Sequence, residues 1–294
     1  LNGVTNFDSS IASSGSGVFI VAGLSGNILR STDNGSSFDN ATSPTANNLY
    51  EVASGNNTFV VVGDNGTIVK STDNGSSFDN ATSPTSNTLF GVGFGNDTFV
   101  AAGISGSIVK STDNGATWDN ATSPTANYLR GIVYGNNTFV AVGDSGNIVR
   151  SNEGSSFDNV TSPVTTNLYG VGFGNSTFVA VGDNGTIVRS TTDNGSSWDN
   201  ATSPTTNNLY GVSFGNNTFV VVGDNGTIVR STDNGSTWDN VTSPTSNFLI
   251  GVGFGYNTFV AAGTYGNILR STDNGSSWDN ATSPTPNQLR GVGF

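Results

Sequence analysis

A unit of about forty residues repeats seven times along this chain, and this period is the strongest constraint on its fold. Each copy contains a variant of Ser-Thr-Asp-Asn-Gly-Ser-Ser-Trp. A period of this length indicates a solenoid, a propeller or an array of small units that complete their cores against their neighbours. The aromatic residues that mark the repeat are Phe38, Phe78, Trp118, Phe157, Trp198, Trp238 and Trp278.

The segment 209–243 shows how one repeat is built. Its runs of β-branched and aromatic residues predict four strands, 209–214, 218–222, 227–231 and 236–242. Asn225-Gly226 is a strong hairpin signal, and Pro244 ends the last strand. We therefore predict an all-β fold, a seven-bladed β-propeller of four-stranded antiparallel blades. A β-solenoid is the alternative, although its rungs are usually shorter.

The C-terminal segment 289–294 has the sequence of a first strand. The first repeat has candidate strands only at 18–22, 27–31 and 37–42, so it lacks such a strand of its own. We predict that the C-terminal strand closes the ring by joining blade one. The predicted propeller domain is then 18–294.

The N-terminal segment carries a surplus copy of the same strand, with Leu1, Val4 and Phe7 at its apolar positions. A Ser- and Gly-rich stretch follows, so residues 1–17 are predicted to be a strand on a flexible tether. Two hypotheses follow for this strand. It packs on its own ring, or it adds to a neighbouring molecule and builds a head-to-tail filament.

Composition excludes several classes of protein. The 9 basic and 21 acidic residues give a net charge of −12, which disfavours nucleic-acid binding. Cys, Met and His are absent, so thiol and imidazole sites cannot form. No apolar run approaches the roughly 18 residues of a membrane helix, so we expect no membrane insertion. The acidic, Gly-, Asn-, Ser- and Thr-rich composition predicts an extracellular or cell-surface location.

The repeated segment resembles the Asp-box, S-x-D-x-G-x-[ST]-[WF]. Asp-boxes are found in sialidases, in BNR-repeat proteins and in the photosystem II assembly/stability factor family. The stretch GDNGTIVRSTDNGSTW at 223–238 is most similar to the last of these. The resemblance covers all seven repeats and implies a β-propeller. It implies little about activity, because this fold hosts many functions.

The Asp-box residues have a sufficient structural explanation in a hairpin turn. The Asp carboxylate accepts backbone N–H bonds, Gly supplies the unusual φ, and the aromatic side chain packs under the loop. The fourth copy departs from the pattern at Ser151–Gly154, which is one residue short, and the fifth compensates with an extra Thr. We expect a structural role for Asp33, Gly35, Asp73, Gly75, Asp113, Gly115, Asp193, Gly195, Asp233, Gly235, Asp273 and Gly275.

The sequence shows no sign of an active site. A sialidase-like centre needs three converging arginines, yet seven of the nine basic residues share one repeat position before the box. We expect them to neutralise the neighbouring box aspartates. The unrepeated carboxylates Asp8, Glu51 and Asp97 show no pairing, and the box lacks the ligand pattern of a calcium loop. We therefore expect no enzyme, no catalytic residue, no metal and no cofactor.

Two other repeated positions are candidates for binding or modification. The residue after the first-strand Leu varies, and it either packs between blades or stacks sugars at the channel mouth. Those residues are Tyr50, Phe90, Arg130, Tyr169, Tyr210, Ile250 and Arg290. Asn-x-Thr sequons on the predicted outer strand are candidate N-glycosylation sites, namely Asn40, Asn80, Asn120, Asn159, Asn200, Asn240 and Asn280.

These features together predict an extracellular, non-enzymatic structural or interaction protein. Its predicted partner is another copy of itself, joined head to tail through the surplus strand of Leu1, Val4 and Phe7. The alternative is a lectin-like adhesin that binds glycans, with one weak site per blade and strength gained by avidity.

Overall fold

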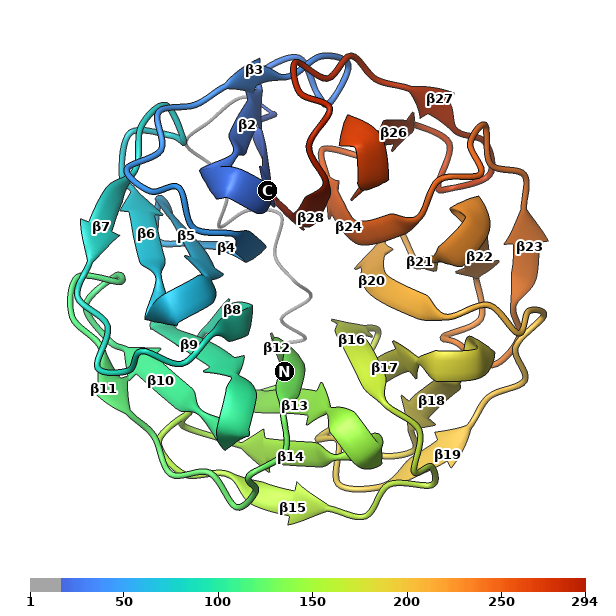
Figure 1. The fold of residues 1–294 in the computed structure, drawn as a ribbon. Coiled ribbons are helices and arrows are strands. Elements are labelled where there is room, and N and C mark those ends of the chain that lie inside the picture. The colour runs from blue at the N-terminus through green and yellow to red at the C-terminus, as the bar shows by residue number, and fades with distance from the viewer. Residues whose placement is uncertain (1–16) are drawn as a thin grey trace, which may run out of the picture.

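The computed structural model describes residues 17–294, which form a closed ring of seven four-stranded antiparallel sheets (Figure 1). This arrangement confirms the predicted seven-bladed β-propeller. The helices of this region are three-residue 3₁₀ turns, and none is long and apolar enough to cross a membrane.

The strands of each blade follow one another from the axis outwards. Blade one contains β28 (Leu289–Gly293), β1 (Phe19–Gly23), β2 (Ile28–Ser31) and β3 (Asp39–Asn40). Blade two contains β4 (Leu49–Gly55), β5 (Thr58–Gly63), β6 (Ile68–Ser71) and β7 (Asp79–Ala81). Blade three contains β8 (Leu89–Gly95), β9 (Thr98–Gly103), β10 (Ile108–Ser111) and β11 (Asp119–Asn120). Blade four contains β12 (Leu129–Gly135), β13 (Thr138–Gly143), β14 (Ile148–Ser151) and β15 (Asp158–Val160).

The remaining blades have the same order. Blade five contains β16 (Leu168–Gly174), β17 (Thr177–Gly182), β18 (Ile187–Ser190) and β19 (Trp198–Asn200). Blade six contains β20 (Leu209–Gly215), β21 (Thr218–Gly223), β22 (Ile228–Ser231) and β23 (Asp239–Val241). Blade seven contains β24 (Leu249–Gly255), β25 (Thr258–Gly263), β26 (Ile268–Ser271) and β27 (Asp279–Asn280). The 3₁₀ turns are η1 (Leu24–Gly26), η2 (Asp64–Gly66), η3 (Ile104–Gly106), η4 (Asp144–Gly146), η5 (Asp183–Gly185), η6 (Asp224–Gly226) and η7 (Thr264–Gly266).

The ring closes in blade one, as the sequence predicts. There β28 from the C-terminus pairs with β1 in an antiparallel register that sets Val292 opposite Val21. Figure 1 shows the last red strand beside the first blue blade. The predicted strand of Leu1, Val4 and Phe7 lies outside the described residues.

The fourth strand of each blade is shorter than the sequence pattern predicts. In blade six the expected strand over 236–242 is reduced to Asp239–Val241. Thr237 belongs to the preceding turn instead, because its backbone N–H and its hydroxyl both donate to Asp233. Short outer strands expose little unpaired edge.

The hydrophobic core lies between the blades. Second strands such as β21 are buried along their whole length, because neighbouring blades cover both faces of each sheet. One cluster joins Val179 and Val181 of blade five to Phe219 and Trp238 of blade six. Each blade therefore completes its core against the next one, as expected of a repeat architecture.

The two flat sides of the ring carry different turns. The side that we call the η face carries η1–η7 and the connections that lead to the next blade (Figure 1). The opposite side, which we call the box face, carries the turns between first and second strands. It also carries the turns of the repeated Asp motif, which we call box turns. Any functional site on one face is built from different residues than a site on the other.

The innermost strands approach one another closely around the axis. A Cβ atom added to Gly251 would lie 1.8 Å from the carbonyl oxygen of Arg290 on the next blade, and one added to Gly170 would meet that of Tyr210 at 2.3 Å. The third residue of each innermost strand is therefore best filled by glycine, and six of the seven blades have glycine there. Glu51 in blade two is the exception.

Candidate functional site

The carboxylates of most box aspartates accept hydrogen bonds from residues of their own turns. In blade six, Asp233 accepts the backbone N–H and the hydroxyl of Thr237 at 2.9 and 2.7 Å, and the Ser231 hydroxyl at 2.8 Å. Gly235, with φ of 75°, donates its N–H to the Ser231 hydroxyl. In blade three, hydrogen bonds from Thr117 lower the pKa of Asp113 to about 2. These carboxylates hold the turn together and remain ionised.

Blades four and five form this turn differently. In blade four, Gly154 still donates to the Ser151 hydroxyl at 2.9 Å, but Glu153 makes no hydrogen bond within residues 17–294. In blade five, the Thr192 hydroxyl accepts the N–H groups of Ser196 and Ser197. The expected turn-forming role of the Asp193 carboxylate therefore passes to Thr192, because the extra residue displaces the aspartate from the accepting position.

The repeated basic residues do not neutralise the box aspartates, and that expectation is wrong. Arg230 donates its Nε–H to the carbonyl oxygen of Asn274 at 2.8 Å, which lies in the box turn of the next blade. Arg30 makes the same bond to Asn74. These side chains reach across the gap between blades, so they link neighbouring blades rather than balance charge within one. Two others, Arg189 and Lys110, reach a serine hydroxyl of the next box turn instead.

The variable position after each first-strand Leu forms a ring of partly buried side chains around the axis on the η face. We call it the axial ring. Neighbouring members contact one another across blades: Tyr50 and Phe90 have ring centroids 5.3 Å apart, as do Tyr169 and Tyr210. The members are Tyr50, Phe90, Arg130, Tyr169, Tyr210, Ile250 and Arg290. The ring combines packing between blades with a surface at the axis.

Three tyrosines of the axial ring are held by aspartates that the sequence pattern did not single out. Tyr210 donates its hydroxyl to Asp224 at 2.8 Å, and the equivalent bonds join Tyr50 to Asp64 and Tyr169 to Asp183. Burial and the bond to Asp224 raise the pKa of Tyr210 to about 12. The signal was present in the sequence, because each aspartate follows its tyrosine by the same 14 residues.

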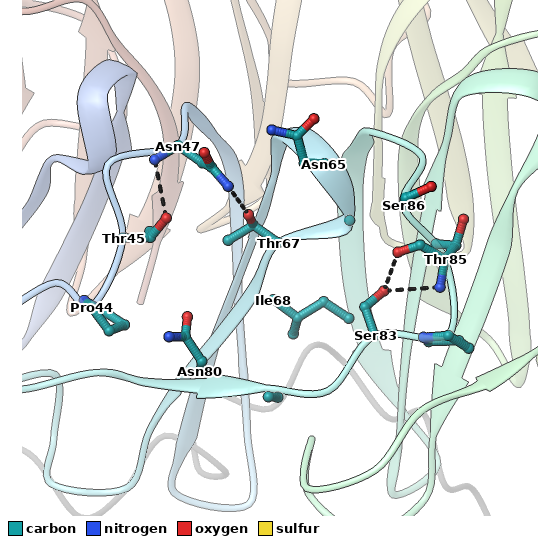
Figure 2. A pocket seen from close by; sticks show the side chains of 13 residues that line it. Pro44, Thr45, Asn47, Asn65, Thr67, Ile68, Asn80, Ser83, Thr85 and Ser86 are labelled. Carbon is teal, nitrogen blue, oxygen red and sulfur yellow. Dashed lines mark hydrogen bonds between the residues drawn. The ribbon is translucent and has the colours of Figure 1, made fainter.

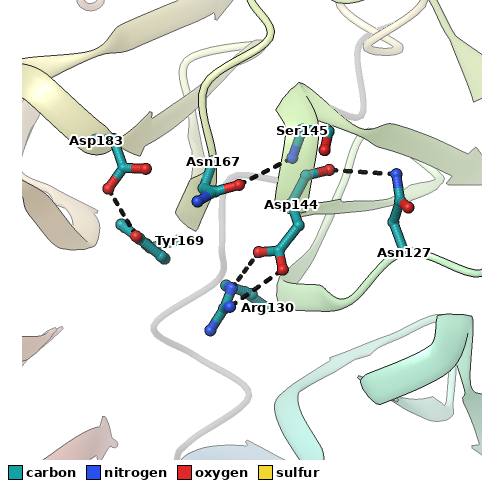
Figure 3. Close-up of polar contacts among 7 residues, drawn as sticks. All are labelled: Asn127, Arg130, Asp144, Ser145, Asn167, Tyr169 and Asp183. Atoms are coloured by element: carbon teal, nitrogen blue, oxygen red, sulfur yellow. Dashed lines mark hydrogen bonds and ion pairs between the residues drawn. The ribbon is translucent and has the colours of Figure 1, made fainter.

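Arg130 occupies the same position in blade four and has its own aspartate. Its guanidinium forms a two-point ion pair with Asp144 (Figure 3), the one ion pair found in residues 17–294. It also lies 5.5 Å from the Phe90 ring centroid, 5.8 Å from that of Tyr128 and 5.3 Å from that of Tyr169. Arg130 is therefore neutralised and caged by aromatic rings.

Arg290 in blade one lacks such an aspartate, because the equivalent residue of its own blade is Leu24. Its guanidinium carbon lies 4.9 Å from the Tyr50 ring centroid, and its buried Nε has no hydrogen-bond partner among the described residues. Burial lowers the pKa of Arg290, while Tyr50 and Asp64 oppose this effect. Arg290 is thus the cation of the axial ring with unused hydrogen-bonding capacity.

Blade seven, which adjoins blade one, carries exposed aromatic side chains on the η face. Phe248 is 44% exposed and Tyr265 is 78% exposed, and Thr264 of η7 donates its N–H to the Phe248 carbonyl. Tyr265 has φ of 59°, where the other 3₁₀ turns have Ser or Asn. A bulky residue with positive φ is uncommon and costs conformational energy.

Glu51 is the one carboxyl group on the seven innermost strands as described. It is partly buried and accepts the N–H of Val52 at 3.0 Å. Burial raises its pKa to about 8. Of the other unrepeated carboxylates, Asp97 accepts a bond from Asn56, and Asp8 lies outside the described residues. No group of three or more metal-ligating residues occurs within 17–294.

The seven sequon asparagines all lie at exposed positions on the outermost strands. Glycosylation at these positions stays a prediction. Extracellular location, and self-association through Leu1, Val4 and Phe7, also stay predictions of the sequence.

Two cavities open on opposite faces. The larger, about 610 Å³, lies at blade two on the η face, between the connections that enter and leave this blade. It is lined by repeated hydroxyl and amide groups, with Asn47 bonded to Thr67 at 2.7 Å (Figure 2). The smaller, about 530 Å³, lies on the box face at blade four and includes Tyr134 and Arg150. The larger has no aromatic or charged lining residue, which leaves it without a sugar-stacking platform.

A family model described as the DUF6242 beta propeller domain matches residues 98–209 and 171–289, which together exceed half of the chain. No curated protein matches the sequence.

Three solved structures show the same fold. The structure of YCF48 bound to D1 peptide has a TM-score of 0.65 and 19% sequence identity, with 81% of each chain covered. YCF48 from Cyanidioschyzon merolae has a TM-score of 0.66 and 16% identity, with 83% of this chain and 88% of that chain covered. A nidogen/laminin complex has a TM-score of 0.62 and 12% identity, with 94% of this chain and 97% of that chain covered. At these identities the likeness shows the fold alone.

Proposed function

The chain belongs to the DUF6242 β-propeller domain family, and we propose that it is a non-enzymatic interaction protein that binds an extended segment of a partner protein on the η face. The observation that carries this proposal is Arg290, a partly buried cation whose blade has Leu24 in place of the 3₁₀-turn aspartate, set against Tyr50 in the axial ring. We further propose that it acts outside the cell or on its surface, as its composition predicts.

The chemistry of the axial ring suits a peptide. Arg, Tyr and Phe are common among the residues that dominate protein interfaces, because they combine large contact areas with directed hydrogen bonds. An acidic or terminal carboxylate of the partner would pair with Arg290, and apolar side chains would pack on Ile250 and Phe248 of blade seven. The net charge of −12 repels acidic proteins elsewhere, so it favours this one cation as the point of contact.

The fold likeness to YCF48 bound to D1 peptide supports the idea that a propeller of this size accommodates a peptide. The seven-fold glycan sites of the alternative hypothesis have less support, because the ring residues differ from blade to blade and the tyrosine hydroxyls are bonded to aspartates.

A displayed peptide library screened on the intact protein tests this function. We expect enriched peptides that carry a carboxylate beside an apolar residue. Arg290→Gln should weaken the binding of a selected peptide at least tenfold, which corresponds to about 1.4 kcal/mol of binding free energy. The control Arg230→Gln, which alters a box-face contact between blades, should leave binding unchanged. An equal loss in both variants, or no enrichment, would overturn the proposal.

A further inference from the structure

The box face of blade four holds a cavity of about 530 Å³ whose lining combines amides, an aromatic ring and a guanidinium. The volume falls within the range of about 300–1,000 Å³ typical of small-molecule sites. Its lining includes Tyr134, Asn136, Asn137, Arg150, Asn152 and Asn194, drawn from blades four and five.

The cavity coincides with a break in the repeat. Blade six has five residues from Ser231 to Gly235, whereas blade four has four from Ser151 to Gly154. The box turn of blade four is therefore shorter, and the Thr138 hydroxyl contacts the amide oxygen of Asn152 at 3.4 Å. No carboxylate lines this cavity, so it is unsuited to a cation.

Tyr134 gives the cavity an aromatic wall with a polar edge. Its ring packs on Phe139 with centroids 4.7 Å apart, and its hydroxyl donates to Asn137 at 3.2 Å. Blade six has Phe214 at the equivalent strand position, which lacks the hydroxyl. Blade four therefore has both the short box turn and a tyrosine at this strand position.

The amides and the guanidinium are held in fixed positions. Asn136 donates its Nδ2–H to the carbonyl oxygen of Asp193 at 3.2 Å, which leaves its amide oxygen free to accept. Arg150 donates from Nη1 to the carbonyl oxygen of Asn194 at 3.2 Å. Asn136 keeps one N–H donor and its acceptor oxygen, and the amide groups of Asn137 and Asn152 keep their N–H donors, a pattern that matches neighbouring hydroxyl groups of a ligand.

We propose that this cavity is a single saccharide-binding site, which takes one sugar ring of a glycan. The exposed edge of Tyr134 contacts C–H groups of the sugar, since Gly95 and Phe139 lie against its ring. The amides of Asn136, Asn137 and Asn152 bond the hydroxyls of the sugar. Arg150 bonds a hydroxyl of a neutral sugar or the carboxylate of an acidic one. The site is independent of the axial ring, which lies on the opposite face.

A glycan array with the intact protein, followed by calorimetry with the methyl glycoside of the best ligand, tests the site. Tyr134→Ala and Asn136→Ala should each weaken binding at least tenfold. The matched blade-six variant Asn216→Ala should bind as tightly as the unchanged protein. Converting Ser-Asn-Glu-Gly at 151–154 to Ser-Thr-Asp-Asn-Gly, which restores the regular turn, should abolish binding.

Two further measurements complete the test. If the ligand is acidic, Arg150→Gln should weaken the binding of a uronic acid at least tenfold and the binding of a neutral hexose less. Equal losses of affinity for the two sugars would indicate a neutral ligand. Arg290→Gln should leave glycan binding unchanged, which separates this site from the peptide site. Absence of array binding, or equal binding by Tyr134→Ala with an unchanged unfolding curve, would overturn the proposal.

Discussion

Blades four and six are built from the same repeat, yet they differ on both faces of the ring. On the box face, Asp233 of blade six accepts four bonds from its turn, whereas Glu153 of blade four makes none within the described residues. On the η face, blade six places Tyr210 where blade four places Arg130.

Between those faces the two blades are alike. Leu129 and Leu209 are both fully buried, as are Phe139 and Phe219. These core positions are therefore the same in the two blades, while each turn and each ring position varies on its own. This separation allows the propeller to vary its surface without altering the contacts that close the ring.

The largest expected effect tests the shared part of the two blades. Trp238→Ala and Phe157→Ala remove the aromatic side chain that packs beneath each box turn, at 6% and 2% exposure. Each should lower the free energy of unfolding in urea by about 3–5 kcal/mol, because the cavity left behind is costly. A loss below about 1 kcal/mol in blade four alone would contradict the view that both blades share one core.

The next effect concerns the strand position where blades four and six have glycine and blade two has Glu51. A pKa raised from 4.5 to about 8 means that the folded state holds its proton more tightly than the unfolded state. Stability should therefore fall as the pH rises from about 4.5 to 8, and Glu51→Gln should remove this dependence. The full shift is worth at most about 5 kcal/mol. Because Glu51 is only partly buried, we expect about 2–3 kcal/mol between pH 5 and 9, measured by urea unfolding.

The control for this measurement is Asp97→Asn, which changes an exposed carboxylate and should leave the pH dependence in place. If the stability of Glu51→Gln depends on pH as strongly as that of the unchanged protein, then ionisation of Glu51 does not destabilise the folded state.

The fold could be predicted from the repeat because each local signal is copied seven times. Asn225-Gly226 indicates a turn in one blade, and its equivalents indicate the same turn in others, so errors in a single copy matter little. The sequence predicts an outer strand over 236–242, longer than the observed one, because all of these residues are compatible with a strand. The turn prevails because the Asp233 carboxylate offers Thr237 two hydrogen bonds.

The candidate sites were harder to predict because they arise where blades meet. The sequence pattern indicates the variable ring position, but it does not single out the partners Asp64, Asp183 and Asp224, which resemble ordinary turn residues. The role expected of the basic residues was wrong because the sequence cannot show that Arg230 reaches the next blade. Contacts between repeats depend on closure of the ring, which no single repeat encodes.

A smaller effect separates the two box turns. Asp233→Ala should lower the free energy of unfolding by about 1–2 kcal/mol, a value reduced by its exposed position. Glu153→Ala should change it by less than about 0.5 kcal/mol. Desolvation raises the pKa of Asp233, but the bonds from Thr237, Ser231 and Ser236 outweigh it and lower the pKa below 3.8. The contribution of Asp233 is therefore present above pH 3.8 and is lost on acidification, so Asp233→Ala and the unchanged protein should converge in stability at low pH.

The smallest effect lies on the η face. Tyr210→Phe removes the hydroxyl that donates to Asp224 and should cost about 0.5–1 kcal/mol in urea unfolding. Tyr265→Phe is the matched control, because this tyrosine is 78% exposed and should change stability by less than about 0.5 kcal/mol. A Tyr210→Phe protein as stable as the control would mean that the aspartates of the 3₁₀ turns do not order the axial ring. Arg130, with its ion pair to Asp144, would then be the one member of the ring that an aspartate holds in place.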